Sequence, residues 1–242
     1  MEGQHGLEAR KLGALARATV MSAILILFSS WIGVTAAGSG AVTPFPVASV
    51  HFEQNFTDAD VEVVFEVKAE DDGLAELFIV SPNGRTVVDF KAPESSTLGI
   101  RQFRFESPEP PDVAALKAAY PEGTYLFSGK TSAGDQFQST SRLSHRLPAA
   151  STFIAPVPET EDVPIRDLDI SWRAVENVLF YIIEIEQDEM NVNITARLPK
   201  SSTSFNVPDE FLVPGTEYEM ELGTVTDEGN ITFVETSFTT ER

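Results

Sequence analysis

The sequence predicts an all-β protein in which two consecutive β-sandwich domains follow an N-terminal export segment. At 242 residues the chain is too long for one sandwich of about 100 residues and suits two of them. Apolar and polar residues alternate in short segments, as in half-buried strands, and Gly, Pro, Asn and Asp clusters separate these segments. A helical pattern is found in one short run after the export segment, which places helices in a minor role.

Composition excludes several classes of function. Hydrophobic residues make up 42% of the chain, including 17 Phe, which is too much apolar material for a disordered protein. The net charge of -20, from 37 acidic and 17 basic residues, argues against binding to nucleic acid or to an anionic membrane surface. Cysteine is absent, which removes disulfides, thiolate metal sites and Cys nucleophiles, and favours a bacterial or archaeal source.

The first 37 residues are typical of an export signal. Arg10, Lys11 and Arg17 precede an uncharged apolar run over residues 18–34, and small residues follow it. Cleavage after Ala36 or Ala37 would remove residues 1–37 and leave residues 38–47 as a linker. The alternative is an uncleaved anchor, because a run of about 17 to 20 residues is at the lower limit for spanning a bilayer. Both alternatives predict an exported chain that is secreted, periplasmic or attached to the cell surface.

Residues 48–148 are predicted to form the first sandwich. Val61, Val63, Phe65 and Val67 face one side of a strand, and a later segment carries Tyr125 on its inward face. The other predicted elements are strands at 75–80, 85–90 and 102–106, a turn at 83–84, and a helix of about two turns at 111–119.

Residues 158–242 are predicted to form the second sandwich, after a Pro- and Ala-rich linker at 149–157. Its strand segments carry Trp172 and then Tyr181, and a later segment runs Leu212-Val-Pro-Gly-Thr-Glu-Tyr218. In this order the residues resemble the fibronectin type III family over residues 155–240.

The resemblance implies that Trp172, Tyr181 and Leu212 are core residues and that Tyr218 is the tyrosine-corner residue, whose hydroxyl bonds to nearby backbone. A weak echo of the Pro-Gly-Thr-x-Tyr pattern leads into Tyr125 in the first domain. The first domain is therefore predicted to be a related immunoglobulin-like sandwich, of a family that the motifs do not identify, with Tyr125 in its core.

No constellation of residues predicts catalysis. His51 and His145, the His residues beyond the export segment, belong to no recognised catalytic or metal motif. The pairs Asp58/Asp60 and Asp167/Asp169 each place two acids on one face of an extended segment, as solvated surface or, alternatively, as oxygen ligands for Ca²⁺. No other cofactor is predicted. Three sequons, at Asn55, Asn193 and Asn230, would matter only in a eukaryotic secretory route.

The sequence therefore predicts a non-enzymatic extracytoplasmic interaction, adhesion or spacer protein, whose partner is a protein or an extracellular polymer. It would contact a membrane only through an uncleaved N-terminal segment. The alternative is an accessory or regulatory domain pair of an exported hydrolase or polysaccharide-processing system. The expected contact elements are loops, at 71–73, 83–84, 188–193 and 227–230.

Overall fold

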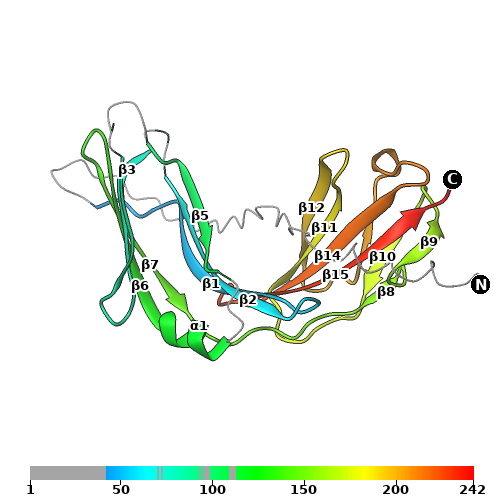
Figure 1. Ribbon diagram of the computed structural model, residues 1–242, viewed down its shortest axis with the longest axis horizontal. Helices are drawn as coiled ribbons and strands as arrows, with labels where there is room; N and C mark the ends of the chain where they lie inside the picture. Colours follow the sequence, from blue (N-terminus) through cyan, green and yellow to red (C-terminus); the bar gives the residue numbers. More distant parts are fainter. Residues whose placement is uncertain (1–41, 70, 72, 93, 95–98, 109–112) are drawn as a thin grey trace, which may run out of the picture.

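The computed structural model describes residues 42–69, 71, 73–92, 94, 99–108 and 113–242, so the predicted export segment and the start of its linker lie outside the described residues. Among the described residues, no helix has the length and apolar character needed to cross a membrane. The prediction of an all-β protein with two sandwiches is confirmed (Figure 1). The elements of the N-terminal sandwich are β1 (Val47–Asn55), β2 (Asp60–Lys68), β3 (Leu74–Val80), β4 (Thr86–Lys91), β5 (Gln102–Glu106), α1 (Val113–Ala119), β6 (Gly123–Thr131) and β7 (Gln136–Leu143).

The C-terminal sandwich follows without a long connection. Its elements are β8 (Phe153–Ala155), β9 (Thr160–Val163), β10 (Asp169–Trp172), β11 (Phe180–Gln187), β12 (Val192–Pro199), β13 (Ser204–Asn206), the 3₁₀ turn η1 (Asp209–Phe211), β14 (Glu217–Val225) and β15 (Ile231–Thr240). The predicted linker at 149–157 thus contains β8, which pairs with β10 and forms one edge of this sandwich.

The two sandwiches have the same strand order. In the N-terminal one, β1-β2-β5 faces β4-β3-β6-β7; in the C-terminal one, β8-β10-β13 faces β12-β11-β14-β15. The period-2 pattern read from the sequence explains the packing, because alternate residues of each strand point into the space between the facing sheets. In the N-terminal core, Phe65 stacks on Phe105 with ring centroids 4.7 Å apart. In the C-terminal core, Trp172 packs against Tyr181 at 5.6 Å.

Each sandwich has a buried tyrosine near the start of the strand that follows the crossover between its sheets. Tyr218 on β14 donates a hydrogen bond from its hydroxyl to the Phe211 carbonyl (3.0 Å) and accepts one from the Val213 N–H (2.9 Å). Tyr125 on β6 donates to the Pro121 carbonyl (3.2 Å). In the N-terminal sandwich, α1 makes the crossover between β5 and β6, and its Leu116 packs into the core. The hydrogen bonds of the two tyrosine hydroxyls fix the backbone where the chain enters the second sheet of each sandwich.

The sandwiches share one continuous sheet. β1 pairs in parallel with β15, with Glu53 opposite Ile231 and Asn55 opposite Phe233. The strand order β12-β11-β14-β15-β1-β2-β5 therefore runs through both sandwiches as an eight-stranded sheet, with β9 paired to the far end of β15. In Figure 1 the sheet bends where β1 and β2 meet β14 and β15, and the two sandwiches form the arms of an open V.

Candidate functional site

The junction where β1 pairs with β15 is centred on one amide side chain. Asn230, fully buried at 0% exposure, donates from Nδ2 to the Ser144 carbonyl (3.0 Å), the Ser144 hydroxyl (3.1 Å) and the Arg146 carbonyl (2.9 Å). Its Oδ1 accepts the Phe52 N–H of β1 at 2.8 Å. One side chain therefore joins the β14–β15 turn to β1 and to the segment that leaves β7. This junction is called the joint below.

The chain between the sandwiches is held along its length. The Ser144 hydroxyl donates to Glu228 (2.6 Å), which also pairs with Arg146 (2.9 Å). Next, Thr232 donates from its hydroxyl to the Pro148 carbonyl (2.9 Å) and Thr224 donates to the Ala149 carbonyl (2.9 Å). Because buried backbone groups need partners, these bonds hold residues 144–149 in one conformation against the C-terminal sandwich.

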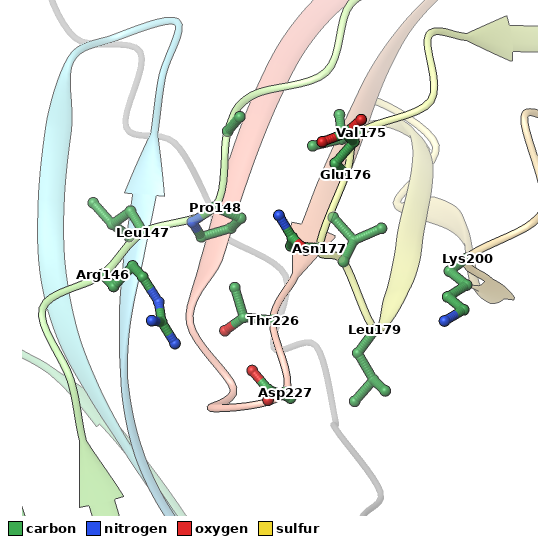
Figure 2. Close-up of a pocket in the computed structure, with 12 residues that line it drawn as sticks. Arg146, Leu147, Pro148, Val175, Glu176, Asn177, Leu179, Lys200, Thr226 and Asp227 are labelled. Carbon is green, nitrogen blue, oxygen red and sulfur yellow. The ribbon is translucent and has the colours of Figure 1, made fainter.

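A groove of about 800 Å³ lies beside the joint. Figure 2 shows Arg146 and Lys200 on opposite sides of it, with Thr226 and Asp227 between them. The side chain of Leu179 is 43% exposed. The lining combines apolar surface with both signs of charge, and its residues are Arg146, Leu147, Pro148, Ala149, Val175, Glu176, Asn177, Val178, Leu179, Lys200, Thr226 and Asp227. Such a surface is suited to contact with another molecule.

A buried network of charges lies on the outer face of the β1-β2-β5 sheet. The guanidinium of Arg104 on β5 contacts Glu53 (3.0 Å), Glu66 (3.3 Å) and Glu106 (2.7 Å), and the His51 ring bonds to Glu53 at 2.8 Å. The side chains of Glu53 and His51 are each 3% exposed. Burial alone would raise the pKa of Glu53, but the His51 bond and the adjacent charges outweigh it and lower that pKa to about 2. Glu66 has the longer contact to Arg104, and burial raises its pKa.

The low pKa of Glu53 predicts a loss of stability in acid. Since the folded state holds Glu53 ionised down to a pKa of about 2, its contribution is present above the ordinary value of 4.5 and is lost as pH falls toward 2. We expect this term to amount to about 3 kcal/mol, and Glu66, whose pKa is raised, to oppose part of it. Urea unfolding at pH 6, 4 and 3 should show a shallower acid dependence in Glu53→Gln than in the native chain. An equal dependence in both would refute the assignment, and exposed Glu217→Gln serves as the control.

A row of glutamates crosses the outer face of the β11-β14-β15 sheet. Glu184 lies directly opposite Glu221, and Glu221 lies directly opposite Glu235. Burial, Glu235 and Glu184 raise the pKa of Glu221 to about 9, and burial raises the pKa of Glu235. At neutral pH Glu221 is therefore a neutral acid that hydrogen-bonds to Glu235.

The four aspartates singled out as candidate metal ligands make bonds within the protein. Asp58 and Asp60 flank Ala59 in the β1–β2 turn; Asp58 accepts the Asn55 amide (3.3 Å) and Asp60 accepts the Asn55 N–H (3.3 Å). Burial and then Asp58 raise the pKa of Asp60. In the described part of the chain, no three His, Asp or Glu side chains are arranged to hold a metal ion.

The second predicted pair is split between different partners. The Asp167 N–H donates to Asp209 (2.8 Å), and Asp169 accepts from the Asn206 amide at 3.2 Å. The backbone of Asp167 and the carboxylate of Asp169 thus make separate local contacts, one in the loop before β10 and one at the β10–β13 pair.

Most of the other residues singled out in the sequence are buried or bonded within the protein. Trp172, Tyr181, Tyr218 and Tyr125 are buried at 0–1% exposure, and Leu212 is buried at 6%. His145 stacks on Phe52 with centroids 4.9 Å apart and its ring bonds to the Tyr120 carbonyl at 2.8 Å. Of the sequon asparagines, Asn230 and Asn55 are buried in the joint, and Asn193 is exposed. The loop at 227–230, expected as an exposed contact element, forms part of the joint.

Sequence reasoning missed the residues that make the joint and the charge network. Asn230 follows a Gly in an acidic segment, a pattern that predicts an exposed turn residue. Arg104, Glu53 and Glu66 occupy polar positions of alternating segments, which predicts solvent exposure. No local pattern predicts that β1 and β15, about 180 residues apart, will pair.

Both sandwiches thus have a three-stranded sheet facing a four-stranded one, with a buried tyrosine bonded to the backbone before its strand. The fold is that of fibronectin type III domains. No family model and no curated protein matches the chain.

Solved structures of tandem fibronectin type III domains are similar to the chain at low identity. The chicken CNTN1 FN1-FN3 domains are 11% identical with a TM-score of 0.34, and the match covers 83% of this chain and 69% of that one. The fibronectin(III)-like modules of Clostridium thermocellum CbhA are 12% identical with a TM-score of 0.32, covering 84% and 92%. A two-domain segment from chicken tenascin is 13% identical with a TM-score of 0.30, covering 80% and 98%. The assignment to the fibronectin type III fold rests on strand order and tyrosine geometry in this chain.

Proposed function

We propose that the protein is a non-enzymatic interaction or spacer protein outside the cytoplasm, which holds two fibronectin type III sandwiches in a fixed V and presents their surfaces to a protein or an extracellular polymer. The observation that carries the proposal is the continuous eight-stranded sheet across the joint. Flexible linkers leave neighbouring domains free to rotate. Shared backbone pairing and the Asn230 bonds favour one orientation instead.

A fixed orientation suits a spacer or a two-sided binding surface because little conformational entropy is lost on binding. The groove beside the joint is the best candidate contact surface. It is lined by the segment between the sandwiches and by loops of the C-terminal sandwich, and Leu179 exposes 43% of its surface there. The loop of residues 188–191 between β11 and β12 offers a second exposed apolar side chain, Met190 at 43%.

Export is part of the proposal and rests on the basic and apolar character of residues 1–37. Absence of cysteine is compatible with export in a bacterium or an archaeon, since neither sandwich needs a disulfide to close its core.

The binding proposal is tested by capture from the native envelope or growth medium with the full chain as bait. Leu179→Ser is expected to reduce capture of a specific partner at least tenfold, because it removes apolar surface from the groove. Val157→Ser is the matched control, since Val157 is 63% exposed and does not line the groove. Equal capture by the native chain and Leu179→Ser would contradict the groove assignment, and no partner under any condition would contradict the binding role.

A further inference from the structure

Three glutamates lie side by side across adjacent strands close to the joint. Glu184 on β11, Glu221 on β14 and Glu235 on β15 are direct neighbours in the antiparallel register. Like charges directly opposite one another destabilise a sheet. The middle residue has a carboxyl group on each side, so Glu221 is the member of the row for which ionisation is most costly.

Glu221 avoids this cost by keeping its proton. Its carboxyl group hydrogen-bonds to the Glu235 carboxylate, and burial with the charges of Glu235 and Glu184 raises the pKa of Glu221 to about 9. The pKa of Glu235 is raised by burial, and the bonds from Asn55 and Glu221 act against that rise. The pair therefore holds one shared proton over the neutral range.

The pair is also a contact between the two sandwiches. Glu235 Oε1 accepts the Asn55 Nδ2 at 2.7 Å, and Asn55 is the last residue of β1. The backbone of Glu235 bonds to the Thr57 side chain: the Glu235 N–H donates to the Thr57 hydroxyl at 2.9 Å, and that hydroxyl donates to the Glu235 carbonyl at 3.4 Å. These bonds hold the β1–β2 turn of the N-terminal sandwich against β15. They form a second anchor of the joint, separate from Asn230.

Acidic groups on the surrounding elements act on the pair. They come from β11, from β14 and from the β1–β2 turn, and they are Glu184, Glu186, Glu219 and Asp58. Asp60 lies in the same turn, bonded to the Asn55 N–H. On β12, the guanidinium of Arg197 stacks over the Phe180 ring at 3.5 Å. In these surroundings, a second negative charge on the pair is opposed from several sides.

We propose that the proton shared by Glu221 and Glu235 fastens the joint between the two sandwiches, and that its loss to solvent at alkaline pH loosens the joint. With the proton present, Glu221 donates to Glu235, and Glu235 Oε1 holds Asn55. After ionisation, the two carboxylates repel each other and the Glu235 side chain moves away, so Asn55 loses its acceptor on β15 and keeps only Asp58 in its own turn. This response is a property of the joint alone and holds whatever partner the protein binds.

The test measures a distance between the sandwiches as pH changes. Because the chain has no cysteine, spin labels can be placed at Ala133→Cys in the exposed β6–β7 turn and at Ser201→Cys in the exposed β12–β13 turn. Pulsed electron paramagnetic resonance on the full chain measures the distribution of distances between the two labels. We expect this distribution to be narrow at pH 6 and broad at pH 10, with a midpoint near the Glu221 pKa of about 9. Glu221→Gln is expected to keep the narrow distance at both pH values, because its amide cannot ionise and still donates to Glu235.

Two controls separate loosening of the joint from general effects. Glu217→Gln, at an exposed position of the same strand and outside the charges that act on the pair, should behave like the native chain. A second label pair within the N-terminal sandwich, Thr86→Cys with Ala133→Cys, should stay narrow at pH 10. An unchanged distance in the native chain from pH 6 to 10 would overturn the proposal. So would equal broadening in Glu221→Gln, or equal broadening of both label pairs, which would indicate unfolding.

Discussion

Asn230→Ala is expected to lower the free energy of unfolding by about 3 kcal/mol or more. The substitution leaves the Phe52 N–H and the carbonyls of Ser144 and Arg146 without the buried partner that all three share. Each unsatisfied buried group costs on the order of 1–3 kcal/mol. Urea unfolding followed by tryptophan fluorescence, to which Trp172 of the C-terminal core contributes, and by far-ultraviolet circular dichroism measures the effect. The two probes should diverge in the variant, because the sandwiches then unfold separately.

Two further variants make the Asn230 prediction specific. Asn230→Asp keeps the size of the side chain but replaces its donor with an acceptor that faces two carbonyl oxygens, so its loss of stability should be at least as large. Asn206→Ala removes an exposed amide that bonds to Asp169 and Leu168, and should change stability by less than about 1 kcal/mol. Similar losses for Asn206→Ala and Asn230→Ala would show that Asn230 has no special role at the joint.

Arg104→Met is expected to lower the free energy of unfolding by about 3–5 kcal/mol, because it removes the cation from a buried group of acids. Glu53 and Glu66 would then lie side by side without the guanidinium that contacts both of them. Methionine keeps much of the length of the apolar stem, so packing is largely retained. The midpoint of urea unfolding at pH 7 gives the loss, and partial recovery is expected at pH 5, where Glu66 takes up a proton more readily.

The matched variant for this prediction is Arg101→Met. Arg101 forms an ion pair with Asp71 in which the two side chains are 66% and 93% exposed. Exposed ion pairs contribute about 0–1 kcal/mol, so Arg101→Met should unfold almost like the native chain. A loss in Arg104→Met no larger than in Arg101→Met would mean that the buried network contributes nothing to folding.

The sequence predicted the sandwiches because their signals are local. Alternation at Val61–Val67 and the Asn83-Gly84 turn depend on neighbouring residues, as does the strand at 102–106, which is found at the expected limits. Of the helix expected at 111–119, residues 113–119 are helical and the first two lie outside the described residues. The Leu212 to Tyr218 segment was predicted from resemblance, and the Tyr218 hydroxyl bonds to Phe211 and Val213 in the structure.

The joint could not be predicted because the residues that form it lie far apart in the sequence. Whether β1 pairs with β15 depends on which sheet edges remain open after both sandwiches form. No short segment of sequence indicates which edges those are. For the same reason Glu53, Glu66 and Glu221 read as outward and solvated residues. Their burial and shifted pKa values depend on strands that lie beside them only in the folded chain.

The pairing of β1 with β15 has a consequence for how the protein is made. The residues that complete the joint, 231–233, follow their partners in β1 by about 180 residues, so they are synthesised much later. Until β15 is synthesised, the backbone groups at the end of β1 form an open edge that another chain could pair with. A chain truncated before residue 231 would keep that edge permanently. The last strand therefore both completes its own sandwich and protects the first one from misassembly.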